Sequence, residues 1–125
     1  MQSYNGENNI LATKSFAFAL SALNIFNELK ENKHFTLANQ FIRSATSIGA
    51  NIEESIGAHS QKDFLAKLII AYKEPRETKY WLRLFIAGHL IVSADAELDM
   101  LEQIIRMLGA SIKTTRTKLN APNML

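Results

Sequence analysis

Cysteine is absent from this 125-residue sequence, which excludes disulfide bonds and thiolate zinc sites. Proline and glycine are scarce, with two and five residues, and Gly57 and Pro122 stand where helices are expected to end. No stretch alternates apolar and polar residues as a half-buried strand requires. Neither charge sign dominates, since 14 basic residues face 12 acidic ones for a net charge of +2. That balance falls well short of a dedicated nucleic-acid binder.

The sequence also lacks the segments that direct a protein to a membrane. Its first ten residues, MQSYNGENNI, have neither the basic start nor the apolar run of a secretory signal. The longest uncharged apolar stretch covers residues 15–27, short of the roughly 20 residues that span a bilayer. We therefore expect a cytoplasmic protein with no membrane partner.

Apolar residues at helical spacing are what the sequence has, in four successive segments. The expected helices cover residues 10–31, 36–56, 60–92 and 95–119, with a frayed or disordered stretch at 1–9 and a tail at 120–125. Thr36 and Ser60 are the expected caps of the second and third helices, and Gly57 is expected to stop the second in a left-handed conformation. Four helices with short connections predict an all-α, antiparallel up-down-up-down bundle.

Pro75 lies inside the long third segment, on its apolar side. A proline there removes the hydrogen bond to the carbonyl of Ala71 and predicts a kink. The alternative is that the segment forms two shorter helices. The apolar spacing continues through the proline as far as His89, which favours one helix with His89 facing the core.

The uncharged stretch 15–27 carries two apolar faces. Phe16, Leu20 and Leu23 mark one, and Phe18, Ala22, Ile25 and Leu29 mark another that is roughly opposite on a helix. A bundle helix of a monomer needs one apolar stripe, so the second face predicts a homo-oligomer. The predicted interface consists of Phe16, Phe18, Ala22, Ile25 and Leu29. The alternative is that one subunit covers both faces.

A polar stripe beside the apolar one marks the second segment. Its members are Arg43, Ser44, Ser47, Asn51 and Glu54, and Glu74, Glu77 and Trp81 lie on one flank of the third segment. If these two helices form a hairpin about residue 59, Arg43 lies opposite residue 75 and meets Glu74 or Glu77. Such a contact is either a half-buried ion pair that fixes helix register or a subunit or ligand contact.

Neither an enzyme nor a metal centre is indicated. Di-iron bundles need two Glu-x-x-His motifs, and this spacing occurs once, at Glu31 and His34. His59 and His89 are far apart in sequence. No serine stands in a strand–turn–helix elbow and no glycine-rich phosphate loop is present. We expect no catalytic residue, no metal, no cofactor and no small-molecule substrate.

The run QFIRSATSIGANIEESIGAHSQKDF, followed by LIIAYKEPRETKYWLRL, resembles a bacterial four-helix-bundle family. The family is named for proteins encoded in intervening sequences of large-subunit ribosomal RNA genes. The resemblance covers about residues 14–118. It implies an antiparallel bundle that assembles as a ring, typically a homopentamer. A similar fold serves as the accessory protein of diversity-generating retroelements, which binds a reverse transcriptase and nucleic acid.

Two functions remain open at this point. The first is a non-catalytic oligomeric scaffold that binds a macromolecular partner as a protein-interaction module. The alternative is an RNA- or DNA-binding accessory protein that uses two outward basic rows. These rows are Arg76, Lys79 and Arg83 in the third segment, and Arg106, Lys113 and Arg116 in the fourth. A simpler explanation of the second row is that acidic residues at the start of a helix and basic ones at its end complement its dipole.

Overall fold

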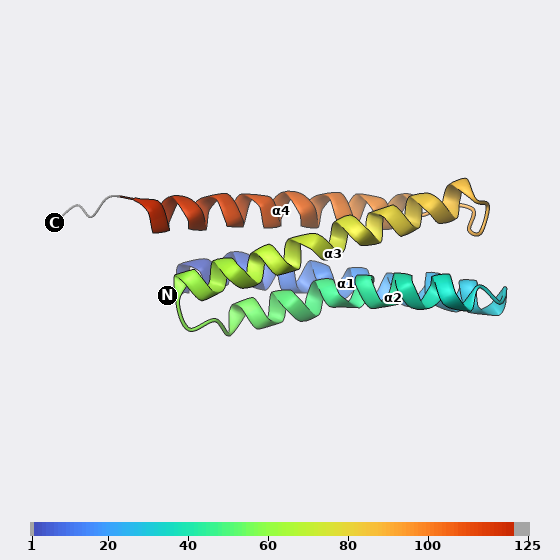
Figure 1. Ribbon diagram of the computed structural model, residues 1–125, viewed down its shortest axis with the longest axis horizontal. Helices are drawn as coiled ribbons and strands as arrows, with labels where there is room; N and C mark the ends of the chain where they lie inside the picture. The colour runs from blue at the N-terminus through green and yellow to red at the C-terminus, as the bar shows by residue number, and fades with distance from the viewer. Residues whose placement is uncertain (1, 122–125) are drawn as a thin grey trace.

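Four antiparallel helices make up the computed structural model, which describes residues 2–121 (Figure 1). They are α1 (Gln2–Glu31), α2 (Phe35–Ile56), α3 (Gln61–Ala87) and α4 (Asp95–Asn120). Each helix packs against its sequence neighbour, and α4 closes the bundle against α1. The described range contains no strand. The predicted all-α up-down-up-down bundle is confirmed.

The helix ends differ from the expected ones at both ends of the chain. α1 begins at Gln2, well before the expected start at Ile10. Most of the stretch that was predicted to be frayed is therefore helical. α4 ends at Asn120, and residues 122–125 of the predicted tail lie outside the described residues. α3 is continuous from Gln61 to Ala87, so Pro75 does not divide it into two helices. A kink at Pro75 stays a prediction.

α3 ends earlier than predicted, because a residue other than glycine stops the helix. His89 has a φ of 62°, which ends α3 at Ala87 and not at the expected Val92. The Leu90 amide then donates to the Phe85 carbonyl at 2.8 Å, the longer bond of a Schellman motif. His89 is exposed in this turn. Its predicted place in the core is therefore wrong.

The turn between α1 and α2 also contains a non-glycine residue in the left-handed conformation. Lys33 has a φ of 67°, and the His34 amide donates to the Leu29 carbonyl at 2.9 Å. α2 begins directly at Phe35 and has no side-chain cap, so the cap predicted at Thr36 is wrong. Gly57 at the other end of α2 has a φ of −85°, so its predicted left-handed conformation is also wrong.

The cap predicted at Ser60 is confirmed. Its hydroxyl accepts a hydrogen bond from the Asp63 amide at 3.0 Å, which satisfies one of the free donors at the start of α3. Asp63 also places a negative charge in the first turn, where it complements the helix dipole. The α2–α3 hairpin is thus fixed at its closed end.

The core consists of one buried stripe from each helix. Its largest fully buried side chains are Leu11, Phe18, Leu29, Phe41, Ile48, Ile52, Phe64, Leu68, Leu82, Phe85, Leu101 and Ile104. Phe41 of α2 and Phe85 of α3 meet edge to face with ring centroids 5.7 Å apart. Such pairs add to the stabilisation from burial. Sequence periodicity predicted these stripes because burial of one face determines the period.

Candidate functional site

The outer face of α1 exposes large apolar side chains in one line. Phe16, Leu20 and Leu23 are 67%, 54% and 41% exposed, and we call these three residues the α1 face. They recur at spacings of four and three, so they form one line along the helix. No charged residue lies between Lys14 and Glu28 to break this surface.

The opposite side of α1 corrects the predicted subunit interface. Phe18, Ala22, Ile25 and Leu29 are buried in the bundle core, so they cannot touch a second copy of the folded chain. The prediction is wrong for these four residues because α2 and α4 already cover that stripe. Of the predicted interface, Phe16 alone is exposed.

Polar contacts with α4 fix the rotation of α1. The Lys14 ammonium donates to the Gln103 side chain at 2.9 Å, and the Ser21 hydroxyl donates to the Glu97 carboxylate. Both contacts lie on the edge of α1 that meets α4. They hold the α1 face away from the core, and α1 itself lies behind α2 and α3 in the view of Figure 1.

By length and composition alone, Ile10–Glu31 of α1 could cross a membrane. This window is longer than the uncharged stretch 15–27 on which the expectation of no membrane partner rested. The core helix of a soluble protein meets the same criterion. The buried stripe of α1 is accounted for by the bundle, whereas its outer face needs a separate explanation.

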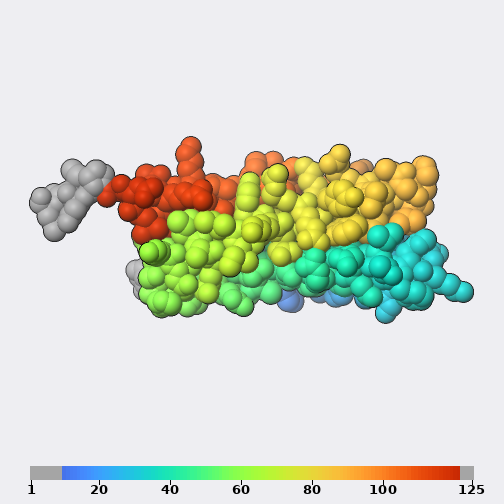
Figure 2. All heavy atoms as spheres, in the orientation of Figure 1, coloured from blue at the N-terminus to red at the C-terminus, as the bar shows by residue number. Residues whose placement is uncertain are grey.

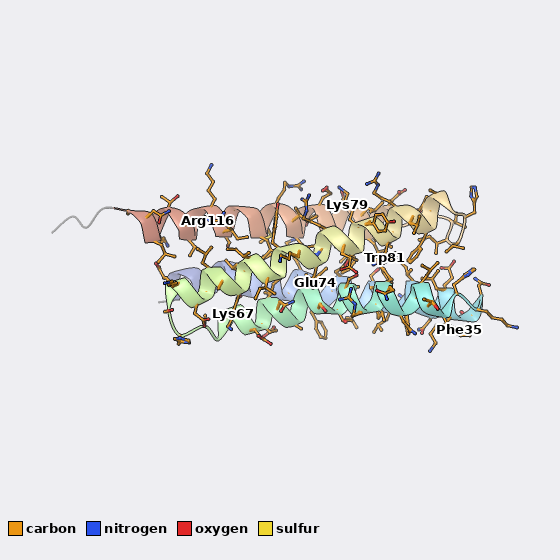
Figure 3. All side chains as sticks on the ribbon, viewed as in Figure 1. Phe35, Lys67, Glu74, Lys79, Trp81 and Arg116 are labelled. Carbon is orange, nitrogen blue, oxygen red and sulfur yellow. The ribbon has the colours of Figure 1, made fainter. Side chains whose placement is uncertain are left out.

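Arg43 of α2 lies between two carboxylates of α3, as the hairpin register predicted. Its guanidinium is 2.5 Å from a Glu77 oxygen and 3.8 Å from a Glu74 oxygen. The Trp81 indole donates to the same Glu77 oxygen at 3.0 Å. Figure 3 shows Glu74 and Trp81 on the side of α3 that faces α2. Because the Arg43 side chain is 53% exposed, the cluster lies at the surface.

The rest of the polar stripe mostly bonds within α2. Ser47 donates to the Arg43 carbonyl at 2.7 Å, and Asn51 donates to the Ser47 carbonyl at 2.9 Å. Ser44 is buried, with its hydroxyl 2.9 Å from that of Thr78 on α3. Glu54 is exposed. Arg43 and Ser44 are therefore the members of the stripe that contact α3. Ser47 and Asn51 form hydrogen bonds to backbone carbonyls of α2 itself.

The basic row of α3 is partly neutralised. The Lys79 ammonium lies 3.0 Å from a Glu102 oxygen of α4, and both side chains are about one-third exposed, at 37% and 38%. The Arg76 guanidinium lies over the Tyr72 ring, 5.8 Å from its centroid. Arg83 is exposed and makes no ion pair among the described residues. Two of the three cations are thus free of carboxylates.

A groove between α3 and α4 was not predicted from the sequence. The ribbons of α3 and α4 diverge toward the C-terminal end of α4 (Figure 1), and a groove of about 880 Å³ lies there. Figure 2 shows the two helices side by side on this face of the molecule. The lining residues are Ile69, Tyr72, Gly109, Ile112, Lys113, Arg116, Thr117, Asn120 and Ala121. Gly109, an isolated glycine within a helical pattern, is the signal that points to it.

The basic row of α4 is divided by this groove. Lys113 and Arg116 line it, whereas Arg106 does not, although all three are exposed. Figure 3 places Arg116 toward the C-terminal end of α4, away from Lys79. In the part of the chain that the structure describes, no three His, Asp or Glu side chains gather as a metal site would require.

Comparison with known proteins identifies relatives of this architecture. Residues 7–110 match the model of a family described as 23S rRNA-intervening sequence protein. A crystal structure of a protein of unknown function from the S23 ribosomal protein family of Bacteroides thetaiotaomicron is 39% identical in sequence. The match covers 86% of this chain and 98% of that one, with a TM-score of 0.80. No curated protein matches the chain.

Proposed function

We propose, from the premise that this chain belongs to the 23S rRNA-intervening sequence protein family, that it is a cytoplasmic, non-catalytic scaffold. The bundle self-associates through the α1 face and binds a macromolecular partner elsewhere on its surface. The observation that carries the proposal is the exposure of Phe16, Leu20 and Leu23 in one line on a helix whose other side already fills the core.

The energetics favour covering the α1 face. Full burial of a Phe or Leu side chain contributes about 1.5–3 kcal/mol, so three half-exposed side chains contribute on the order of 3–4 kcal/mol per subunit. Large contiguous apolar patches are rare on monomers and mark interaction sites. A closed ring repeats the same contact at every subunit. The resemblance of the sequence to its family implies five subunits.

Light scattering coupled to size exclusion tests self-association. We expect the wild-type protein at micromolar concentration to have a mass that is a multiple of the 14.1 kDa chain. Leu20→Glu places a charge in the middle of the α1 face and should give the monomer mass. Val92→Glu is the matched control, because Val92 is an apolar side chain 94% exposed outside α1, and it should keep the wild-type mass.

Two results would contradict self-association through α1. One is a wild-type mass of 14.1 kDa at micromolar concentration. The other is an unchanged mass for Leu20→Glu with a helical circular dichroism spectrum. If the wild-type protein is monomeric and sediments with lipid vesicles while Leu20→Glu does not, the α1 face is instead a membrane contact.

Nucleic-acid binding is the second candidate function. It is supported by the exposed cations Arg76, Arg83 and Arg106 and by the absence of any acidic residue after Glu102. Binding that depends on phosphate contacts loses affinity steeply as salt rises, with a logarithmic slope of roughly −0.7 to −0.9 per neutralised phosphate.

A gel shift at low salt separates this candidate from the first. Replacing Arg76, Lys79 and Arg83 together with Gln should reduce the salt slope if the α3 row contacts phosphates. An absence of binding to structured RNA, single strands and duplex DNA at low salt would eliminate nucleic acid as the partner.

A further inference from the structure

We infer that the groove between α3 and α4 is a docking site for an acidic amphipathic helix of a protein partner. This inference deepens the proposed function, because it assigns a place and a chemistry to the macromolecular partner of the scaffold. It does not depend on self-association through the α1 face, which lies on a different helix.

The floor of the groove is apolar. Ile69 and Tyr72 of α3 and Ile112 of α4 line it, and Gly109 leaves room between them. A β-carbon placed at Gly109 would lie 3.8 Å from the Tyr72 ring, at ordinary contact distance. Any longer side chain there would project into the groove. The absence of a side chain at this position is thus what keeps the floor open.

The rim of the groove is basic, and no carboxylate among the described residues pairs with it. Lys113 and Arg116 are exposed and make no ion pair among the described residues. The carboxylate of Asp63, the acidic residue in the first turn of α3, is already 3.6 Å from the Lys67 ammonium. No acidic residue follows Glu102 in the sequence. An occupant that carries carboxylates would therefore complement this rim.

The helix dipole does not account for both cations. Its effect falls off within the last turn of a helix. Lys113 lies seven residues before Asn120, the last residue of α4, which is about two turns from the end. Thr117 and Asn120 add neutral hydrogen-bonding groups along the same edge. The rim is thus arranged along the groove and is not confined to the terminus.

The shape of the groove favours a helix over other occupants. From Gly109 to Asn120 it follows about 16 Å of α4, the length of three helical turns. A helix that lays an apolar stripe in such a groove and keeps polar flanks outside is a common recognition mode. Two rim cations above an apolar floor offer little to a phosphate backbone, which needs a continuous basic track.

Fluorescence anisotropy with designed peptides tests the inference. The probe is a labelled peptide of about fourteen residues with Leu at positions i, i+3, i+4 and i+7 and Glu on both flanks. We expect saturable binding in the micromolar range that weakens as salt rises. The same peptide with Lys in place of Glu should bind at least tenfold more weakly, and a scrambled peptide of the same composition should not saturate.

Variants of the protein locate the binding. Gly109→Met fills the floor, and because glycine is a poor helix former, the variant should fold at least as well as wild type. We expect it to lose at least tenfold in affinity for the acidic peptide. Lys113→Gln with Arg116→Gln should lose roughly three- to tenfold, as two exposed pairs would. The matched control, Arg106→Gln with Lys118→Gln, removes the same charge outside the groove and should stay within about twofold.

Several outcomes would overturn the inference. They are no binding of the acidic peptide at about 100 µM, equal binding of the Lys peptide, or wild-type affinity for Gly109→Met. A monomeric Gly109→Met in a protein that otherwise self-associates would show that a second copy occupies the groove. Leu20→Glu should bind the acidic peptide as wild type does, so failure of self-association and failure of docking are separate results.

Discussion

Replacement of Arg43 by Met tests whether the Arg43 cluster is a surface feature or a buried ion pair. Arg43 contacts Glu77 at 2.5 Å and Glu74 at 3.8 Å, so it joins α2 to α3 near the middle of their hairpin. Methionine keeps an apolar stem of similar length, so the packing of the side chain is largely preserved. The variant therefore removes charge and hydrogen bonds with little loss of contact area.

The exposed fractions decide the magnitude. The Arg43 and Glu77 side chains are 53% and 37% exposed, and pairs of this kind contribute about 0.2–1 kcal/mol. Glu74 is less exposed, at 20%, and one of its oxygens is buried without a hydrogen bond among the described residues. Loss of the nearby Arg43 cation raises the free energy of this buried, charged oxygen in the folded state. We expect a total loss of about 1 kcal/mol, not the 3–5 kcal/mol of a broken buried pair.

Urea and thermal unfolding followed by circular dichroism measure the change. For a chain of this length, about 1 kcal/mol corresponds to a fall of about 4 °C in melting temperature. The matched control is Arg83→Met, which removes the same charge from an exposed position of α3 with no ion pair among the described residues. It should change stability by less than about 0.5 kcal/mol. The excess of Arg43→Met over this control should shrink in 1 M salt.

Two results would refute this reasoning. A loss of more than about 3 kcal/mol that salt does not reduce would mean that the cluster is desolvated in solution, for example by a second subunit. A loss equal to that of Arg83→Met would mean that the contacts to Glu74 and Glu77 contribute nothing. A double-mutant cycle with Glu77→Gln then assigns the coupling to that pair.

Three further substitutions are expected to change the free energy of unfolding, measured by urea titration. His89→Gly should raise it by about 0.5–1 kcal/mol, because His89 holds a left-handed φ of 62° that glycine adopts without strain; an unchanged value would mean that the turn is not strained. Ser60→Ala should lower it by about 1 kcal/mol through loss of the bond to the Asp63 amide, and no loss would show that water replaces the cap. Ser15→Ala should raise it by about 1 kcal/mol, since the Ser15 hydroxyl is buried without a hydrogen bond in the described range; a fall would reveal a partner for this hydroxyl.

The fold was predictable because its signals are local. Burial of one face imposes a 3.6-residue period on each helix, and four such segments with short connections leave few arrangements. The errors lie at helix ends whose stop signal is absent from the sequence. Lys33 and His89 hold left-handed conformations that are usual for glycine, while Gly57, which has the expected residue type, does not.

The contact of Arg43 with α3 was predictable because the register of one hairpin determines it. The groove was not predictable because it depends on how two helices are placed relative to each other. A hairpin about residue 59 puts Arg43 opposite the Glu74–Glu77 turn whatever the rest of the bundle does. The groove between α3 and α4 depends on the divergence of two helices, which no local pattern encodes. The sequence pattern therefore joins Lys113 and Arg116 in a basic row but does not indicate that Ile69 and Tyr72 lie beside them.

The orientation of α1 is tied to one close helix contact, which hydropathy does not record. A β-carbon at Gly49 of α2 would lie 3.6 Å from the β-carbon of Ser15, so the two helices approach closely at this point. Ser15 allows this approach because its side chain is small. The α1 face consists only of Phe16, Leu20 and Leu23, and turning it toward α2 would force the helices apart and break the contact at Gly49. The close packing at Gly49 thus favours the observed orientation of α1, in which the α1 face is exposed.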